Sequence, residues 1–145
     1  MGFIPRVRAI WARIPQRREP VAAPYQPRSN GQPDPGEVVW AWVPYEEDPR
    51  QGKDRPVLVL RVTSDAVIGL ALTSKDHDRD ADQEAEVGRY WMDIGSGSWD
   101  TRGRPSEVRL NRVLSLSPDD VRREGGRVSA QLYEQVLRAA EPYLD

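Results

Sequence analysis

The sequence predicts a mainly β domain, a small and strongly bent sheet or barrel that one C-terminal helix closes. Short runs of β-branched and aromatic residues recur between turn signals, which is typical of β architectures with short strands. A capped amphipathic helix ends the chain. The 145 residues are enough for one domain.

Three strands follow one another from Gly36 onward. Residues 37–43 (EVVWAWV) are apolar on both faces, as in a buried strand, and Pro44 ends them. Residues 44–54 form a polar loop that fits neither period. Residues 55–62 and 67–73 then predict two strands joined by a tight turn at 63–66.

The second half of the domain predicts shorter strands and two helices. Residues 90–92, 106–110 and 113–116 are the strand candidates. Ser117-Pro118-Asp119-Asp120 has the cap, proline and acids that begin a helix, and Gly125-Gly126 would end it. Ser129 caps the terminal helix, whose apolar face comprises Leu132, Tyr133, Val136, Leu137 and Ala140.

The hairpin of residues 55–73 places a cation beside hydroxyl groups. If residues 64 and 65 form the turn, Arg55 lies opposite Ser74, and a one-residue bulge brings it level with Thr73 instead. Both arrangements put a guanidinium and hydroxyls at one strand end, between the 44–54 loop and the charged 74–86 loop. These are the components of a phosphate site, although a strand-end arginine that extends into solvent is the simpler interpretation.

The chain before the domain divides into a basic extension at 1–19 and a Pro-rich linker at 20–35, which leaves 36–145 as the domain. Residues 1–28 carry a net charge of +5, and residues 29–145 carry −7. Apolar residues at helical spacing predict a short basic amphipathic helix in the extension. Docking on the domain, contact with a membrane surface and contact with nucleic acid are its three interpretations.

The composition excludes several classes of chemistry. The chain has no cysteine and one histidine, His77, so disulfides, thiol nucleophiles, Cys-ligated zinc and two-histidine sites are ruled out. His77 lies in an acidic loop that lacks the spacing of a calcium site. We therefore expect no metal and no cofactor, and, without an export signal, a cytoplasmic protein.

Several separated segments resemble the PemK/MazF family of toxin–antitoxin endoribonucleases. The matching motifs are Gly36–Trp40, the loop proline Pro44, residues 52–60 (GKDRPVLVL), residues 72–74 (LTS) and residues 105–113 (PSEVRLNRV). They agree with the family in order and spacing across about residues 36–117, and the terminal helix adds to the likeness.

This resemblance implies an SH3-like barrel of the MazF/PemK/CcdB type with a C-terminal helix, usually a homodimer. It implies metal-independent cleavage of single-stranded RNA through a 2′,3′-cyclic phosphate, and neutralisation by an antitoxin protein. By position in the motifs, Arg55 and Thr73 take the catalytic places, and Ser74 is the less favoured equivalent of Thr73. We expect the neighbouring cations Arg50, Lys53 and Arg109 to bind substrate.

Two further questions stay open at the level of sequence. A catalytically silent barrel that docks a protein target is the alternative function, and the acidic residues of the 44–54 loop favour it. Trp40 and Trp42 fit a core or a dimer interface, whereas Trp91 and Trp99 flank a Gly/Ser turn from which they would stack on bases or on a partner peptide. Arg112 would extend a phosphate track or form part of an outer polar face.

Overall fold

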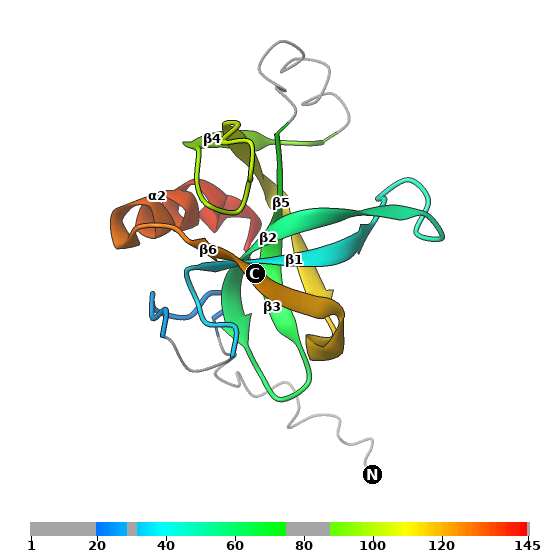
Figure 1. Ribbon diagram of the computed structural model, residues 1–145, viewed down its shortest axis with the longest axis horizontal. Helices are drawn as coiled ribbons and strands as arrows, with labels where there is room; N and C mark the ends of the chain where they lie inside the picture. Colours follow the sequence, from blue (N-terminus) through cyan, green and yellow to red (C-terminus); the bar gives the residue numbers. More distant parts are fainter. Residues whose placement is uncertain (1–19, 29–31, 75–87, 145) are drawn as a thin grey trace, which may run out of the picture.

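A computed structural model describes residues 20–28, 32–74 and 88–144. They form one six-stranded antiparallel sheet with the strand order β4-β5-β3-β2-β1-β6, and a helix that packs on it (Figure 1). The strands are β1 (Glu37–Pro44), β2 (Gly52–Val62), β3 (Val67–Thr73), β4 (Trp91–Gly95), β5 (Ser106–Leu116) and β6 (Val121–Arg127). A short 3₁₀ turn at Pro118–Asp120 precedes β6. The helix α2 (Ala130–Ala140) follows β6, and a second 3₁₀ turn at Glu141–Tyr143 follows α2.

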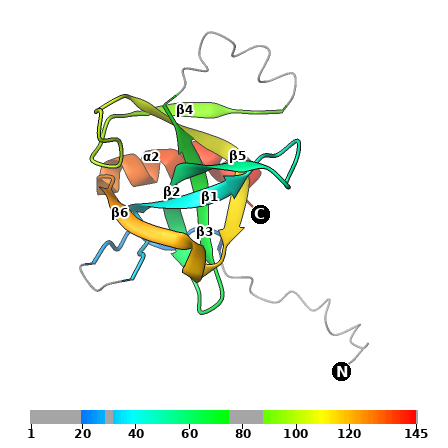
Figure 2. The ribbon, with the colours of Figure 1, turned by 45° about the vertical axis from the view of Figure 1, so that its right-hand side comes forward.

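The predicted fold class is confirmed: the domain is mainly β and barrel-like, with a C-terminal helix packed on the sheet. Apolar side chains are buried on both faces of the bent sheet. One cluster, which includes Leu58, Leu70 and Val108, lies beneath α2, and the other is built from small residues of β1, β2, β3 and β5 such as Val57 and Ala71. Figure 2 shows α2 behind the strands, with the edge strand β4 above it and the edge strand β6 below.

The predicted terminal helix is confirmed together with its cap. The Ser129 hydroxyl accepts a hydrogen bond from the Leu132 backbone N–H at 3.0 Å, which satisfies one of the free donors of the first turn. Tyr133, Val136 and Ala140 are buried. They lie three or four residues apart, so one face of α2 packs against the sheet.

The strands β1 to β3 lie where the sequence places them, except that β2 begins three residues earlier, at Gly52. The two predicted strands at 106–110 and 113–116 are one strand, β5, with an irregular register opposite β3 between Leu70 and Leu72. The bulge bends β5 while keeping it in the sheet, which is why the sequence divides it into two runs.

The helix predicted from Ser117 to Gly125 is wrong beyond its first turn. The Ser117 cap is correct, since its hydroxyl accepts from the Asp119 backbone N–H at 3.4 Å, but one 3₁₀ turn later the chain enters β6. Gly125 belongs to this strand because a Cβ there would lie 2.2 Å from the Val38 carbonyl oxygen of β1. Close approach of two backbones, and not a helix end, explains this glycine.

The register of β2 and β3 changes by one residue at Leu60. Val57 pairs with Ala71 and Val59 with Gly69, but Arg61 pairs with Ile68. This is the bulge that the sequence left open. Below the bulge Val57 pairs with Ala71. Continued by two residues towards the start of β2, this register brings Arg55 level with Thr73.

The bulge also supplies an anchor for residues 20–28, which we call the N-terminal strap. The Leu60 carbonyl accepts the Ala23 backbone N–H at 2.7 Å and the Tyr133 hydroxyl at 3.2 Å. Tyr133 also donates to the Ala23 carbonyl at 2.6 Å, and the Tyr25 hydroxyl donates to the Val128 carbonyl at 2.6 Å. The prolines predict a linker here, whereas the strap packs on the core.

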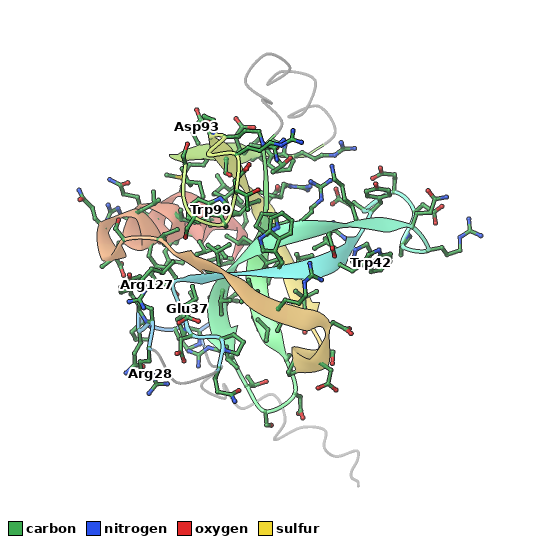
Figure 3. All side chains as sticks on the ribbon, in the orientation of Figure 1. Arg28, Glu37, Trp42, Asp93, Trp99 and Arg127 are labelled. Atoms are coloured by element: carbon green, nitrogen blue, oxygen red, sulfur yellow. The ribbon has the colours of Figure 1, made fainter. Side chains whose placement is uncertain are left out.

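One tryptophan differs from its predicted surroundings. Trp99 is only 3% exposed and donates its indole N–H to the Ser106 hydroxyl at 2.9 Å, so it belongs to the core and does not stack on a ligand. Trp42 is 47% exposed and lies on the β1–β2 hairpin, away from α2 (Figure 3), so of its two predicted settings the core is excluded and the dimer interface stays a prediction. The predicted helix of the 1–19 extension and the loop around His77 lie outside the described residues.

Within the described ranges, no helix has both the length and the apolar character needed to cross a membrane.

Candidate active site

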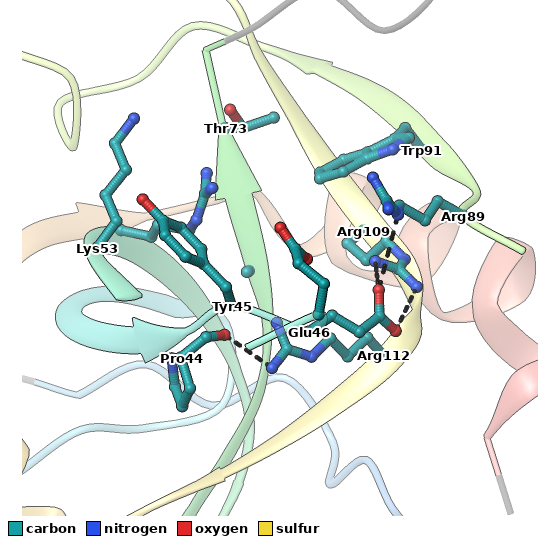
Figure 4. A pocket seen from close by; sticks show the side chains of 12 residues that line it. Pro44, Tyr45, Glu46, Lys53, Thr73, Arg89, Trp91, Arg109 and Arg112 are labelled. Atoms are coloured by element: carbon teal, nitrogen blue, oxygen red, sulfur yellow. Dashed lines mark hydrogen bonds and ion pairs between the residues drawn. The ribbon is translucent and has the colours of Figure 1, made fainter. Parts of the chain in front are cut away.

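A pocket of about 260 Å³ opens between the β1–β2 loop, the end of β3 and the paired strands β4 and β5 (Figure 4). Its walls combine cations, two carboxylates, two aromatic rings and two hydroxyls, those of Tyr45 and Thr73. The lining residues are Pro44, Tyr45, Glu46, Glu47, Lys53, Arg55, Ala71, Thr73, Arg89, Trp91, Arg109 and Arg112.

Arg55 and Thr73 line the same wall of this pocket. Arg55 is half-buried on β2, and Thr73 is 9% exposed at the end of β3. The side chain of Arg55 lies on the face shared by Val57, since alternate residues of a strand point the same way. Ala71, which pairs with Val57, also lines the pocket.

A second wall is built around Arg109 of β5, whose side chain is 7% exposed. Its Nε donates to the Asn111 Oδ1 at 2.6 Å, which holds the plane of the guanidinium. Its two Nη groups donate to the two carboxylate oxygens of Glu46, each at 3.1 Å. Glu46 comes from the β1–β2 loop, so this fork-to-fork pair joins segments 63 residues apart.

Further cations surround the same carboxylate. The Nε of Arg89 lies 3.7 Å from the Glu46 Oε1. Arg112 donates to the Pro44 carbonyl at 2.8 Å, which fixes the base of the loop that carries Glu46. The Arg109 guanidinium also lies 5.9 Å from the centre of the Trp91 ring, within the range of a cation–π contact.

The charge of the pocket is opposite to that of the domain. Five cationic residues and two carboxylates line it, whereas residues 29–145 carry a net charge of −7. Hydrogen bonds from Arg109 lower the pKa of Glu46 below its usual value, and the charges of Arg109, Arg112 and Arg89 act in the same direction. Burial lowers the pKa of Arg112.

This arrangement suits an anionic ligand that carries a phosphodiester. Guanidinium groups bind phosphate oxygens bidentately, and a neighbouring hydroxyl adds a directed donor. Low exposure strengthens such contacts because water does not screen them fully. No group of three or more histidine, cysteine or acidic residues that would hold a metal ion occurs among the residues that the structure describes.

The structure brings four of the six predicted site residues together. Arg55, Thr73, Lys53 and Arg109 line the pocket, and Arg112 lines it as well. Arg50 and Ser74 do not line it. The Arg50 side chain is 89% exposed at the tip of the β1–β2 loop, where it pairs with Asp48 at 3.1 Å, and Ser74 is exposed beyond β3.

The sequence does not point to four of the polar and aromatic lining residues. Tyr45, Glu46 and Glu47 belong to a loop whose acidic residues favour the docking alternative, and Arg89 precedes a strand in a segment without periodicity. Glu46 had one available signal. It lies two residues after the motif proline Pro44, and that proline would bring it to the same strand end as Arg55.

Comparison with known families identifies one match. A family model described as the PemK-like, MazF-like toxin of type II toxin-antitoxin systems matches residues 34–144. The match contains all six strands, α2 and the pocket. No curated protein matches the chain.

Proposed function

Because the chain belongs to the PemK-like, MazF-like toxin family of type II toxin-antitoxin systems, we propose that it is a metal-independent endoribonuclease that cuts single-stranded RNA. The observation that supports this proposal best is the shared pocket of Arg55 and Thr73, with four further cations around them. The family as a whole comprises toxins known as endoribonucleases, and the cleavage chemistry of this chain is our proposal.

In the proposed reaction, the ribose 2′-hydroxyl attacks the adjacent phosphorus. A bond forms between the 2′-oxygen and phosphorus while the bond to the 5′-oxygen breaks. The 2′-hydroxyl loses its proton to water and the leaving 5′-oxygen gains one from water, which leaves a 2′,3′-cyclic phosphate and a 5′-hydroxyl with no net change in protons. The nucleophile belongs to the substrate itself. The reaction therefore needs neither a thiol nor a pair of histidines, and the sequence has no cysteine and one histidine.

Arg55 would bind the scissile phosphate and stabilise the additional charge of the pentavalent arrangement. A guanidinium has a pKa above about 12, so it is a weak base but a persistent cation. Thr73 would donate its hydroxyl proton in a hydrogen bond to a non-bridging oxygen. Interactions that strengthen as charge develops accelerate the chemical step more than they improve binding.

An antitoxin partner is expected for a toxin of this family. We propose that it neutralises the enzyme by covering the pocket, and that the toxin is a homodimer. An RNA substrate and an antitoxin partner would both fit a cytoplasmic protein, which stays the predicted location. The membrane contact considered for the 1–19 extension has no part in this proposal.

The direct test is cleavage of a long single-stranded RNA in EDTA, with the ends of the products mapped. We expect the wild type to cut at a short recurring sequence and to leave cyclic phosphate ends. Arg55→Ala should abolish cutting. Arg138→Ala is the matched control because it removes an exposed arginine of α2 that lies outside the pocket.

No cutting by folded wild-type protein that is free of antitoxin would contradict the enzymatic proposal. The barrel would then fit the docking alternative, and its protein target would be sought by affinity capture. Cutting that stops in EDTA would contradict the metal-independent chemistry while leaving a nuclease.

A further inference from the structure

The Glu46 carboxylate occupies a position that suits a phosphate group. Its two oxygens each accept one Nη–H of Arg109 at 3.1 Å, the same bidentate geometry in which an arginine binds two phosphate oxygens. The Arg109 guanidinium is already oriented for binding an anion, because its Nε donates a hydrogen bond to the Asn111 Oδ1 at 2.6 Å. A buried and oriented cation is a strong anion receptor.

The Glu46 carboxylate is easier to displace than the Arg109 guanidinium. The Glu46 side chain is 45% exposed, against 7% for Arg109. Glu46 lies in the β1–β2 loop, which is closed by backbone hydrogen bonds between Tyr45 and Gln51 at 2.8 Å and between Gln51 and Asp48 at 3.0 Å. A competing anion would therefore move the carboxylate of a surface loop and leave the strand behind it in place.

The receptor lies beside the proposed catalytic residues. Thr73 pairs with Glu107 across β3 and β5, and Arg109 is two residues further along β5. Diagonal neighbours of this kind are about 7–8 Å apart on one face of an antiparallel pair. That separation is comparable with the span of one nucleotide in an extended strand, so a phosphate next to the scissile one would reach Arg109.

An aromatic ring beside Arg109 makes this wall suitable for binding a nucleotide. Trp91 pairs directly with Arg109 across β4 and β5 and also lines the pocket. Indole rings stack on nucleobases without strong sequence preference. An RNA segment would use both the cation and the ring, whereas an acidic peptide would use the cation alone, and this favours RNA.

We propose that Glu46 occupies the phosphate position of Arg109 in the free protein and must leave when RNA binds there. The inference rests on the proposed ribonuclease function. It makes the β1–β2 loop an internal competitor of the substrate. Glu46→Gln therefore improves RNA binding, and the improvement depends on Arg109.

The test measures binding of a single-stranded 2′-fluoro RNA of mixed sequence, which lacks the attacking hydroxyl, over a range of salt concentrations. Glu46→Gln should lower Kd about two- to fivefold, as expected for removal of a partly exposed ion pair. Glu47→Gln is the matched control. It removes the same charge from the same pocket, but no hydrogen bond or ion pair between Glu47 and Arg109 occurs in the described structure, so its effect should be smaller.

The second part of the experiment removes the Arg109 guanidinium. Arg109→Gln should raise Kd about tenfold and reduce the slope of log K against log salt by about 0.7, the value of one single-strand phosphate contact. In the Arg109→Gln background, Glu46→Gln should have no more effect than Glu47→Gln. If Arg109→Gln does not fold, as judged by circular dichroism, the comparison of Glu46→Gln with Glu47→Gln decides alone.

Equal effects of the two glutamine variants, or an unchanged salt slope in folded Arg109→Gln, would overturn the inference. Tighter Arg109-dependent binding of oligoglutamate than of RNA would also overturn it, in favour of an acidic peptide. Cleavage of unmodified RNA is assayed in parallel. Cutting without an Arg109 effect refutes this inference alone, Arg109-dependent binding without cutting refutes the proposed reaction alone, and neither binding nor cutting refutes both.

Discussion

The two ends of β2 are built for different purposes. At one end, Lys53 and Arg55 line the pocket, and no carboxylate or carbonyl bonds the Arg55 guanidinium within the described residues. At the other end, the bulge at Leu60 releases a carbonyl that the strap and Tyr133 both satisfy. Among the described residues, one end thus presents the unbonded donors of the Arg55 guanidinium, and at the other end the donors and the Leu60 carbonyl acceptor are already bonded to one another. The difference separates residues that should control activity from residues that should control stability.

Removal of Arg55 should have the largest effect. Arg55→Ala should lower kcat by about 10³-fold or more while KM changes far less, because the cation acts most strongly on the charge that develops in the transition state. Its thermal stability should stay close to that of the wild type, as expected for a side chain without a structural partner. Single-turnover cleavage and a thermal melt measure both quantities. A large loss of Tm would remove the contrast between the two ends.

Removal of the Thr73 hydroxyl should have the next largest effect. Thr73→Val keeps the shape and the β-branch but deletes the donor, so cleavage should fall about 10²-fold, as for loss of one donor to a developing oxyanion. Ser74→Ala is the control because Ser74 lies outside the pocket wall. If Ser74→Ala is the more damaging of the two, the hydroxyls have been assigned in the wrong order.

At the opposite end, Tyr133→Phe should reduce stability and leave cleavage almost unchanged. The change deletes hydrogen bonds to Ala23 and Leu60 and leaves one part-buried and one buried carbonyl with fewer donors, a loss of about 1–2 kcal/mol in the free energy of unfolding. Urea unfolding measures the loss, and kcat measured well below the melting temperature tests the rest. A fall in kcat comparable with that of Thr73→Val would show that the two ends are coupled.

The smallest expected effect is the pH dependence of the Glu46–Arg109 pair. Arg109 lowers the pKa of Glu46 in the folded protein, so the pair contributes stability above the ordinary carboxyl pKa of 4.5 and loses it as the pH falls through the lowered pKa. The pair is partly exposed, which limits the contribution to about 1 kcal/mol or less. The difference in unfolding free energy between the wild type and Glu46→Gln should therefore shrink from pH 7 to pH 3. A constant difference would contradict the assignment.

Much of the fold could be predicted because its elements have clear periods. The strands β1 to β3 and the cap and apolar face of α2 follow from local patterns. The strand β6 could not, because its charges and paired glycines resemble a helix end unless the close approach to Val38 is known. The packing of the N-terminal strap could not be predicted for a similar reason. Prolines restrict the local backbone conformation of a segment, but they do not indicate what the segment packs against.

The candidate site was predictable to the extent that hairpin geometry and motifs apply. Arg55 and Thr73 could be placed together from one hairpin and one family resemblance. The contact between Arg109 and Glu46 depends on residues 63 positions apart, and no local pattern records it. By composition alone the acidic 44–54 loop argues against anion binding, whereas in the structure one of its carboxylates, that of Glu46, is bound to Arg109.

The position of Trp91 gives the pocket an optical probe of its own. Its indole lies 5.9 Å from the Arg109 guanidinium and faces the pocket, whereas Trp99 is shielded in the core. We expect a ligand that displaces Glu46 to alter the emission of Trp91, and Trp91→Phe to abolish this signal while Trp99 continues to fluoresce. A stopped-flow trace of this emission would then time the exchange of anions directly, without a labelled RNA.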